Sequence, residues 1–553
     1  MENHPMCRLI MLVAILAVPA VCVAKIIHVP ADRPSIQDGI NVAFNGDTIL
    51  VAPGTYVENI DFLGKAITLK SSHGAEWTTI DGGSPYPADY SSVVKFISGE
   101  GKQTVLDGFT ITNGTGVPYD KSSSSSTYGY RGGGIRCKAT SPTIINNVIS
   151  GNKAQVGGGI YCSELSCAFI AHNTISGNES ELGGGFACYE SSPVLLNNEI
   201  TENIADESGG GIYCVWLCAP IIKSNVITGN LSGLTGLEVS GGGIFLKWGF
   251  HSVATILNNV IMSNISGVGG GIASYKSSQL VVNNIISGNM ASTGGGIELL
   301  QSTGTRMINN TVFDNSASFG GGICVEMFTR SAKITNTIIW DNKASGQGSE
   351  ICLMGIIHKP CIQIDYSNVD RSTGSVYATS GSILWGSGMI ESDPLFVDPD
   401  NNDFNLLYTS PCRNAGDNSA VTERFDYRGD PRIAHGTVDM GADEFHNNLY
   451  CIGDFTPNGQ IEGKLIGLPG TSPIGLFFGS GFLDPPSHHT WGNFYLVAPW
   501  FMVPLGLSIP ADGILKLPKT IPVTPVAPYD VYMQALIGLD FDSLTNLFVL
   551  EVR

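Results

Sequence analysis

The residues Gly157-Gly158-Gly159-Ile160-Tyr161-Cys162 decide the fold, because their opening motif recurs along most of the chain. Three glycines followed by an apolar residue begin at Gly132, Gly157, Gly183, Gly209, Gly241, Gly269, Gly294 and Gly320. The steps between these positions are 25, 26, 26, 32, 28, 25 and 26 residues. A nearly fixed period of this size indicates a stack of repeated supersecondary units. The chain is therefore expected to present one long, regular surface.

Each repeat also carries a pair of polar residues, a short β-branched run and a further asparagine. The first copy runs from Asn146-Asn147 to Asn152, and the second from His172-Asn173 to Asn178. Together with the triplet, this gives three strand-like pieces per repeat, separated by Gly, Asn and Ser turns. Helical repeats need long runs with a period near 3.6, which Gly triplets would interrupt. The pattern predicts an all-β fold, a single-stranded parallel β-helix of about 25–26 residues per coil.

Strand parity predicts which side chains line the lumen of this β-helix. Ile135 and Cys137 share one face of their strand and Arg136 the other, so the apolar face is expected to point inward. The position of Cys137 is taken in later coils by Cys162, Cys188, Cys214, Leu246, Ser274, Leu299 and Val325. Interchange with Leu and Val favours packing over a thiol or metal ladder. The asparagines are expected at corners, in left-handed conformation and bonded to the Asn above and below.

Three candidate disulfides follow from closeness in sequence: Cys162 with Cys167, Cys214 with Cys218, and Cys352 with Cys361. They would form only in an oxidising compartment. The first residues favour such a compartment, because Arg8 and an apolar run ending in small residues at Ala24 are typical of a signal peptide over residues 1–24. The chain is therefore expected to be secreted or at the cell surface. The run is too short for a spanning helix, so no membrane span is expected in the mature chain.

Residues 25–445 are predicted to form the β-helix, and residues 446–553, where Gly triplets stop and Pro and Leu rise, a β-sandwich-like module. A short amphipathic helix is expected to cover the N-terminal end of the lumen, with Ile36, Ile40 and Phe44 on its buried face. The net charge of −19 argues against nucleic acid as a partner, since phosphate binding needs clustered Lys and Arg. The oligomeric state is not predicted.

Several segments outside the triplets resemble one known group. They are "IIHVPADRPSIQDGI", "GDTILVAPGTYVENI" and "LDGFTITNG" before the repeats, and "DPLFVDPDNNDFNL" and "VDMGADEF" after them. In these segments and in its "GGGI" coils, the chain resembles secreted bacterial right-handed β-helix proteins of the pectin-lyase-like superfamily over residues 26–445. The resemblance implies a right-handed β-helix and export. It implies little about activity, because the superfamily contains lyases, hydrolases, esterases, epimerases and non-catalytic surface proteins.

The catalytic motifs of those enzymes are not found in the sequence. The Asp-Asp pair, Gly-His-Gly and Arg-Ile-Lys of polygalacturonases are missing from the repeats, and so is the Gly-x-Val-Asp-Phe-Ile-Phe-Gly segment of pectin methylesterases. Pectate lyases need several acids in register for calcium and an Arg base, and the strands after the triplets carry too few acids. No catalytic residue is therefore assigned, and the chain is not expected to act as these enzymes do.

The outward positions beside the triplets carry aromatic residues instead. They are Tyr161, Tyr189, Tyr213, Trp216, Phe245, Trp248 and Tyr275. Aromatic faces spaced along a strand array suit stacking on sugar rings, which makes these residues candidates for binding a polysaccharide or cell-surface glycan. The alternative is that the rings cover the outer sheet or pack under loops, since aromatic residues are ordinary strand formers.

A weaker candidate concerns calcium, and no other cofactor is expected. Asp398, Asp400, Asn402 and Asp403 have the early spacing of a calcium loop. The segment lacks the following Gly and the distal Glu, so a structural acidic turn is favoured.

Three functions stay open on the sequence. The favoured hypothesis is a non-catalytic surface protein that binds glycan or acts in adhesion. The alternatives are a polysaccharide lyase, hydrolase or epimerase with an unrecognised site, and a purely structural surface rod.

Overall fold

The structure is a computed structural model that describes residues 24–445 except 84–91, 119–129, 234–239, 250–251, 328, 330–331, 356–358 and 380. Beyond residue 445 it describes strand segments between Leu449 and Val552. The predicted signal peptide thus lies outside the described residues, apart from Ala24. Among the described residues, the structure contains no helix whose length and apolar character would suit a membrane span.

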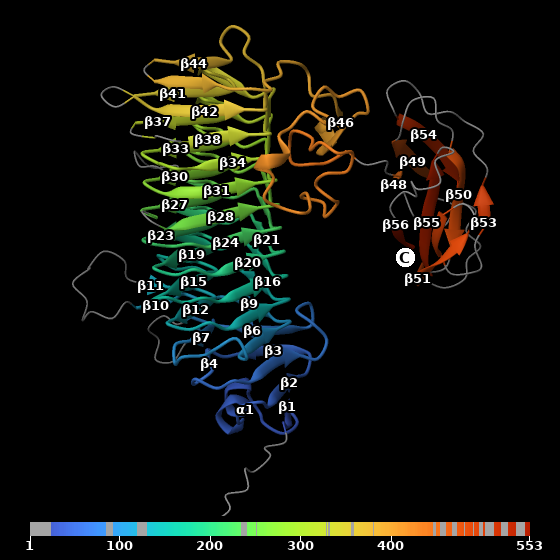
Figure 1. The fold of residues 1–553 in the computed structure, drawn as a ribbon. Coiled ribbons are helices and arrows are strands. Elements are labelled where there is room, and N and C mark those ends of the chain that lie inside the picture. The colour runs from blue at the N-terminus through green and yellow to red at the C-terminus, as the bar shows by residue number, and fades with distance from the viewer. Residues whose placement is uncertain are drawn as a thin grey trace, which may run out of the picture.

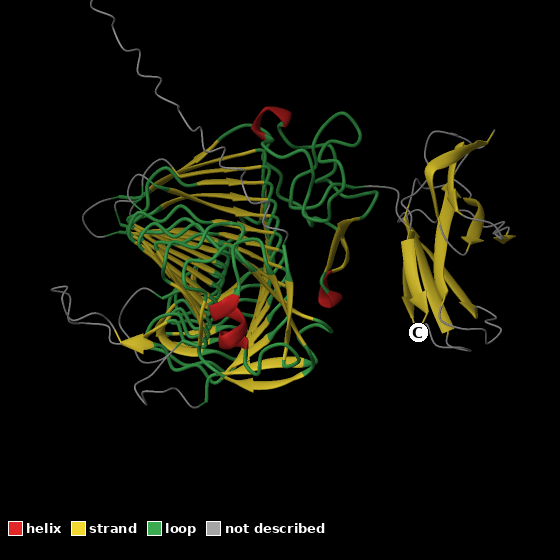
Figure 2. Cartoon of the chain, turned by 90° about the horizontal axis from the view of Figure 1, so that it is seen from below, coloured by secondary structure: helices red, strands yellow, loops and turns green. Residues whose placement is uncertain are grey.

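Most of the described chain winds into a stack of coils whose strands pair in parallel with their copies in the next coil (Figure 1). Each coil contributes one strand to each of three sheets, with 14, 12 and 12 strands in the described part. Viewed along the stack, the strands surround a common axis and the loops lie at the corners (Figure 2). The predicted all-β parallel solenoid is confirmed.

The first sheet runs from β1 (Ile26–Val29) to β45 (Ser382–Trp385), and the third from β3 (Gly54–Val57) to β43 (Asn368–Val369). The second sheet contains the strands that follow the glycine triplets. Its members are β4 (Ile60–Asp61), β7 (Val94–Phe96), β12 (Ile135–Lys138), β15 (Ile160–Ser163), β19 (Phe186–Tyr189), β23 (Ile212–Val215), β27 (Ile244–Lys247), β30 (Ile272–Tyr275), β33 (Ile297–Leu300), β37 (Ile323–Glu326), β41 (Ile351–Met354) and β44 (Val376–Ala378).

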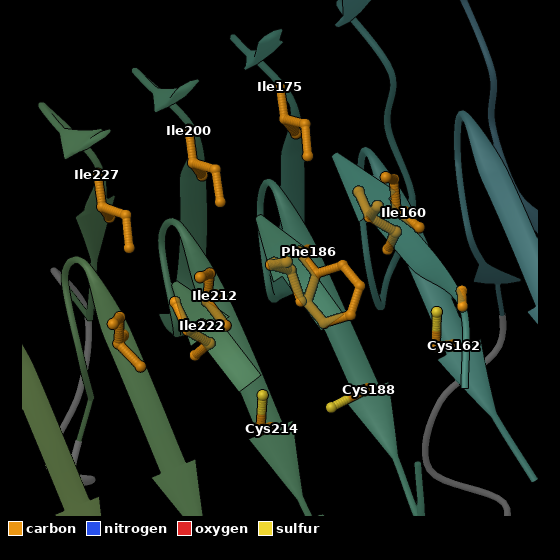
Figure 3. Packing of buried hydrophobic residues seen from close by; sticks show 14 of the residues in the cluster. Ile160, Cys162, Ile175, Phe186, Cys188, Ile200, Ile212, Cys214, Ile222 and Ile227 are labelled. Carbon is orange, nitrogen blue, oxygen red and sulfur yellow. The ribbon is translucent and has the colours of Figure 1, made fainter. Parts of the chain in front are cut away.

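The lumen is filled by the residues that strand parity assigned to it. Cys137, Cys162, Cys188 and Cys214 pair in register and are buried in one continuous apolar core with Ile135 and its equivalents. Figure 3 shows the sulfur atoms of Cys162, Cys188 and Cys214 in successive coils. Leu246 follows Cys214 in register, and Ser274, Leu299 and Val325 continue the row. The row is a packing feature, as the interchange of residue types predicted.

The three predicted disulfides are wrong for the described cysteines, all of which carry free thiols. Cys218 Sγ lies 3.5 Å from Cys188 Sγ, one coil below, rather than against Cys214. Cys352 lies in register with Cys324 and not beside Cys361. Cys162 faces the lumen whereas Cys167 is exposed. Closeness in sequence failed as a guide because a solenoid brings together residues one coil apart.

The asparagines form two ladders through the corners, as expected, and the roles within each pair are divided. The first residue of a pair takes the left-handed conformation, for example Asn146 at φ 56°. The second bonds between coils, beginning with Asn147 Nδ2 donating to Asn173 Oδ1 at 3.0 Å and continuing to Asn310. The further asparagine of each repeat builds the second ladder from Asn152 to Asn342.

The second ladder ends on a buried carboxylate. Glu350 accepts hydrogen bonds from the backbone N–H of Asn342 at 3.0 Å and from its Nδ2 at 2.6 Å. Burial raises the pKa of Glu350 to about 8, although both Asn342 bonds act in the opposite direction.

The predicted N-terminal cap is α1 (Ile36–Val42), which packs Ile36 and Ile40 into the core. The expectation for Phe44 was wrong. The helix ends before it, at the cap residue Ala43, and Phe44 is 71% exposed. The Ser35 side chain and the Glu58 carboxylate accept hydrogen bonds from the first N–H groups of the helix.

The closing segment after β45 folds back along the stack and covers part of the outer face of the third sheet. Phe396, Phe404 and Met440 pack with Ile285 and Ile338. Corner side chains of the coils, such as Asn258, donate to backbone carbonyls of this segment. This part of the third sheet is therefore closed to ligands.

Beyond residue 445 the described strands β48 (Leu449–Gly453) to β56 (Phe548–Val552) pair antiparallel, as a β-sandwich requires. The domain boundaries stay a prediction.

Candidate functional site

The second residue after each triplet forms a row on the outer face of the second sheet, which we call the outward column. Its members are Arg136, Tyr161, Ala187, Tyr213, Phe245, Ala273, Glu298, Cys324 and, after the variant triplet Gly348-Ser349-Glu350, Cys352. Apart from Arg136, all of them are buried, although they point away from the lumen.

The glycine triplet explains this burial. The first glycine has a left-handed backbone, with φ 68° at Gly157, so the chain turns back over the strand that follows. A Cβ at Gly157 would lie 2.9 Å from Tyr161 Cβ, and one at Gly320 would lie 2.7 Å from Cys324 Cβ. Only glycine leaves room for the outward side chain beneath the turn.

The aromatic part of the outward column is buried. Tyr161, Tyr213 and Phe245 pack with Val156 and Leu182, which precede triplets. The Tyr213 and Phe245 rings are 5.7 Å apart. Burial raises the pKa of Tyr161 to about 12, and Arg131 Nη1 donates to its hydroxyl at 3.1 Å. These three rings pack under the turns, so they offer no open face to a sugar. Strand parity correctly predicted that these side chains point away from the lumen, but it did not predict that the glycine turns bury them.

Trp216, Trp248 and Tyr275 lie instead at the corner where the second sheet ends. The Trp216 and Trp248 ring centroids are 5.1 Å apart, and those of Trp248 and Tyr275 are 6.4 Å apart. Trp216 is 38% exposed, and the other two are half-buried. The Lys247 ammonium lies 4.6 Å from the Trp248 ring and that of Lys276 lies 4.9 Å from the Tyr275 ring. We call these five residues the corner ladder.

Tyr189, the remaining aromatic candidate, is half-buried and packs against the aromatic part of the outward column. It lies in register with Val215, which the next coil places beside Lys247. Tyr189 therefore lies two coils from the first lysine of the corner ladder.

An acid–thiol cluster occupies the other end of the outward column. The ligand atoms of Glu298, Cys324 and Glu326 all lie within 4.8 Å of one another. Glu298 and Cys324 are buried, and Glu326 is half-buried. Burial raises the pKa of Glu298 well above its usual range, and the nearby Glu326 raises it further. Sequence reasoning missed this cluster, although a Glu in a row of otherwise small or apolar residues was a visible signal.

A second missed feature is a surface hollow of about 330 Å³ at the corner before the triplets. Its charged lining comes from three adjacent coils and consists of Lys153, Glu179, Glu181 and Asp206. The Lys153 ammonium pairs with Glu179 at 2.7 Å, and Gln155 donates to Glu181 at 3.1 Å. Strands β18 (Glu179–Leu182) and β22 (Ile204–Ser208) position the acids by parallel pairing.

Comparison with known families supports the architecture. A family model described as a right handed β-helix region matches residues 95–246. The chain is a right-handed parallel β-helix protein. The expected right-handed parallel β-helix is thereby confirmed.

Two solved structures are similar to this β-helix protein at low identity. One is described as the complex structure of XylC with xylose, with a TM-score of 0.42 and 11% identity, and the match covers 74% of this chain and 95% of that one. The other is a crystal structure of pectate lyase Pel9A, with a TM-score of 0.39 and 13% identity, covering 77% and 97%. A comparison with curated proteins gave no match.

The calcium candidate of this β-helix protein lies in a hairpin between β46 (Phe396–Asp398) and β47 (Asp403–Leu406). Asn401 donates to both carboxylate oxygens of Asp398 at 3.1 Å. The Asp403 carboxylate lies 3.5 Å from the Arg428 guanidinium. Asn402 takes the left-handed turn conformation between Asp400 and Asp403. Protein donors thus already engage two of the four candidate ligands, which favours the structural turn.

Proposed function

We propose that this β-helix protein is secreted and binds a polysaccharide or cell-surface glycan at the corner ladder, without catalysing its conversion. The single observation that carries the proposal is the run of three contacting aromatic rings on adjacent coils, with an ammonium group over two of them. Export rests on the signal-peptide pattern of residues 1–24.

The corner ladder suits a chain of sugars for a physical reason. Each coil adds one aromatic side chain, so the stacking surfaces repeat along the stack as sugar rings repeat along a polysaccharide. Aromatic faces cover the apolar faces of sugar rings, and neighbouring polar groups fix the hydroxyls. Lys247 and Lys276 supply N–H donors beside the rings, and they would also attract an acidic sugar.

The test uses the mature chain from residue 25 onward and a panel of insoluble polysaccharides. Depletion of the protein from solution is measured for the natural chain and for the double variant Trp216→Ala, Trp248→Ala. Loss of two stacking rings is expected to weaken retention about tenfold or more.

Trp385→Ala is the matched control. Trp385 is also partly exposed and also carries a cation over its ring, since the Arg371 guanidinium lies 5.2 Å from it. It belongs to β45 and not to the corner ladder. Equal retention of the double variant and the natural chain would remove the glycan proposal, and so would an equal loss in the control.

A second candidate function is a polysaccharide-active enzyme, and the hollow beside Lys153 favours it. Three carboxylates from two adjacent coils, Glu179, Glu181 and Asp206, line this hollow, and hydrolysis of a polysaccharide commonly uses a pair of carboxyl groups. Incubation with the same panel, followed by assays for reducing ends, unsaturated products, acetate and methanol, decides between the two. Turnover that is lost in Glu181→Gln or Asp206→Asn would establish the enzyme and refute the binding-only function.

A further inference from the structure

The acid–thiol cluster has the composition of a ligand set, and the β-helix holds it rigidly. Glu298, Cys324 and Cys352 follow one another in register on β33, β37 and β41. Glu326 lies two residues beyond Cys324 on the same outer face of β37. All four side chains belong to four-residue strands that pair in parallel, so the register of the sheet sets their spacing.

Glu298 is the decisive residue. It is fully buried, and neither carboxylate oxygen has a described partner in good hydrogen-bond geometry. The turn encloses it tightly, since a Cβ at Gly294 would lie 2.8 Å from Glu298 Oε2. A buried carboxyl without a partner costs several kcal/mol unless something satisfies it.

The ionisable groups that act on Glu298 are themselves acids. They are Glu326, Cys324 and Cys352, and the neutral Thr293 side chain lies beside them, so none of these described neighbours brings a positive charge. Buried charges in proteins are either paired or coordinate metals. We infer that Glu298, Cys324 and Glu326 bind a divalent cation of the zinc class.

The donor atoms select this class of cation. A thiolate with two carboxylates suits zinc, whereas calcium and magnesium take oxygen ligands throughout. Tetrahedral zinc, with Zn–S of about 2.3 Å and Zn–O of about 2.0–2.2 Å, places its ligand atoms roughly 3.5 Å apart. The three ligand atoms already lie within 4.8 Å of one another, so a small closure brings them to that spacing.

Binding of the cation releases protons from its ligands. The Cys324 thiol loses its proton to become the thiolate ligand, and a Glu298 carboxyl that carries a proton loses it on binding. Both protons pass to solvent as the cation enters, so affinity is expected to rise with pH.

The experiment uses the full mature chain without a polyhistidine tag, freed of metal with a chelator and kept reduced. Titration with Co²⁺ is followed by the sulfur-to-cobalt charge-transfer absorption, and Zn²⁺ is then added as competitor. We expect one equivalent of Co²⁺ per chain and its displacement by Zn²⁺. Cys324→Ala is expected to abolish the charge-transfer band, and Glu298→Leu to weaken binding at least tenfold while the chain keeps its native circular dichroism.

Glu350→Gln is the matched control, because Glu350 is an equally buried carboxyl on a neighbouring coil whose oxygens already accept bonds from Asn342. It is expected to bind as the natural chain does. Three results would overturn the inference: absence of the charge-transfer band in the natural chain, unchanged affinity in both Glu298→Leu and Cys324→Ala, or displacement of Co²⁺ by equal Ca²⁺. A Cys324–Cys352 disulfide in protein isolated without reductant would overturn it as well.

Discussion

The two ends of the outward column share one backbone environment and differ in what fills it. In the lower coils Tyr161, Tyr213 and Phe245 pack as rings against apolar neighbours. In the upper coils Glu298, Cys324 and Cys352 occupy the same register under the same glycine turns. Burial at this position is therefore a property of the triplet and not of the side chain beneath it.

The two ends differ in whether their buried polar groups have hydrogen-bond partners. Rings need only contact, and the buried phenol of Tyr161 accepts a hydrogen bond from Arg131. The carboxyl of Glu298 has no partner in good hydrogen-bond geometry among the described residues. The lower part of the column thus stabilises the coil, whereas the upper part costs stability until something binds there. Variants at the two ends are expected to change stability in opposite directions.

Phe245→Ala is expected to show the largest effect. Phe245 is fully buried, and replacing such a ring by Ala removes contacts and leaves a cavity worth about 3–5 kcal/mol of unfolding free energy. Urea denaturation monitored by circular dichroism measures the loss. Phe44→Ala is the control, because that ring is 71% exposed and its loss is expected to stay within about 0.5 kcal/mol. A Phe245 variant as stable as the control would show that the lower column does not stabilise the coil.

Glu298→Leu is expected to change the free energy of unfolding in the opposite direction. In metal-free protein the substitution replaces an unpartnered buried carboxyl by an apolar side chain of similar size, so stability is expected to rise by about 1–3 kcal/mol. Glu350→Leu is the comparison variant, and it is expected to destabilise, because Asn342 would lose both acceptors. A loss of stability in Glu298→Leu would mean that a partner for Glu298 exists within the fold.

The pH dependence distinguishes the two ends as well. Burial raises the folded-state pKa of Glu298 well above its ordinary 4.5 and that of Glu350 from 4.5 to about 8. The folded chain therefore holds protons that the unfolded chain releases, and stability falls as pH rises from about 4.5 through 8, by at most about 1.4 kcal/mol per pH unit for each group. Urea midpoints at pH 5.5, 7 and 8.5 in chelator measure this. Glu298→Gln should make the urea midpoint depend less on pH. An unchanged dependence would mean that another group causes the titration.

Tyr161→Phe is expected to have the smallest effect. The ring stays, and only the bond from Arg131 is lost, which amounts to about 0.5–1.5 kcal/mol. With a pKa of about 12, the Tyr161 phenol stays protonated through neutral pH, so its loss leaves the pH profile unchanged below about pH 10. An altered profile between pH 5.5 and 8.5 would couple the lower column to the acids above.

The fold could be predicted from the sequence, because the repeat period and the alternation of side chains along each strand are enough to define a β-helix. The glycine and asparagine spacings predicted the coils, and alternation placed Cys137 and Ile135 in the lumen. The burial of the outward column depends on the path that the backbone takes at the triplet. The spacing between residues in the sequence does not reveal that path. For the same reason the glycan candidates divide into the buried Tyr161, Tyr213 and Phe245 and the accessible corner ladder.

The acid–thiol cluster escaped prediction for a related reason. Glu298 and Glu326 lie 28 residues apart, and their proximity depends on the exact register of adjacent coils. Phe44 failed because a helix pattern does not fix the last residue of a helix. The disulfide candidates failed because neighbours in the chain diverge where coils turn.

The asparagine ladders give the solenoid an electrical direction. Main-chain bonds between parallel strands alternate in sense, so their dipoles largely cancel. The amide carbonyls do not alternate: along the ladder from Asn152 to Asn342, each Oδ1 after the first accepts from the Asn of the earlier coil, while one Nδ2–H donates to the later coil and the other to a backbone carbonyl of the earlier one. Their partial charges add along the axis, as peptide dipoles add along a helix, with the positive pole at the later end. Glu350 lies at that pole and accepts the last donors of the ladder, the Asn342 backbone N–H and Nδ2, so it terminates the column in hydrogen bonding.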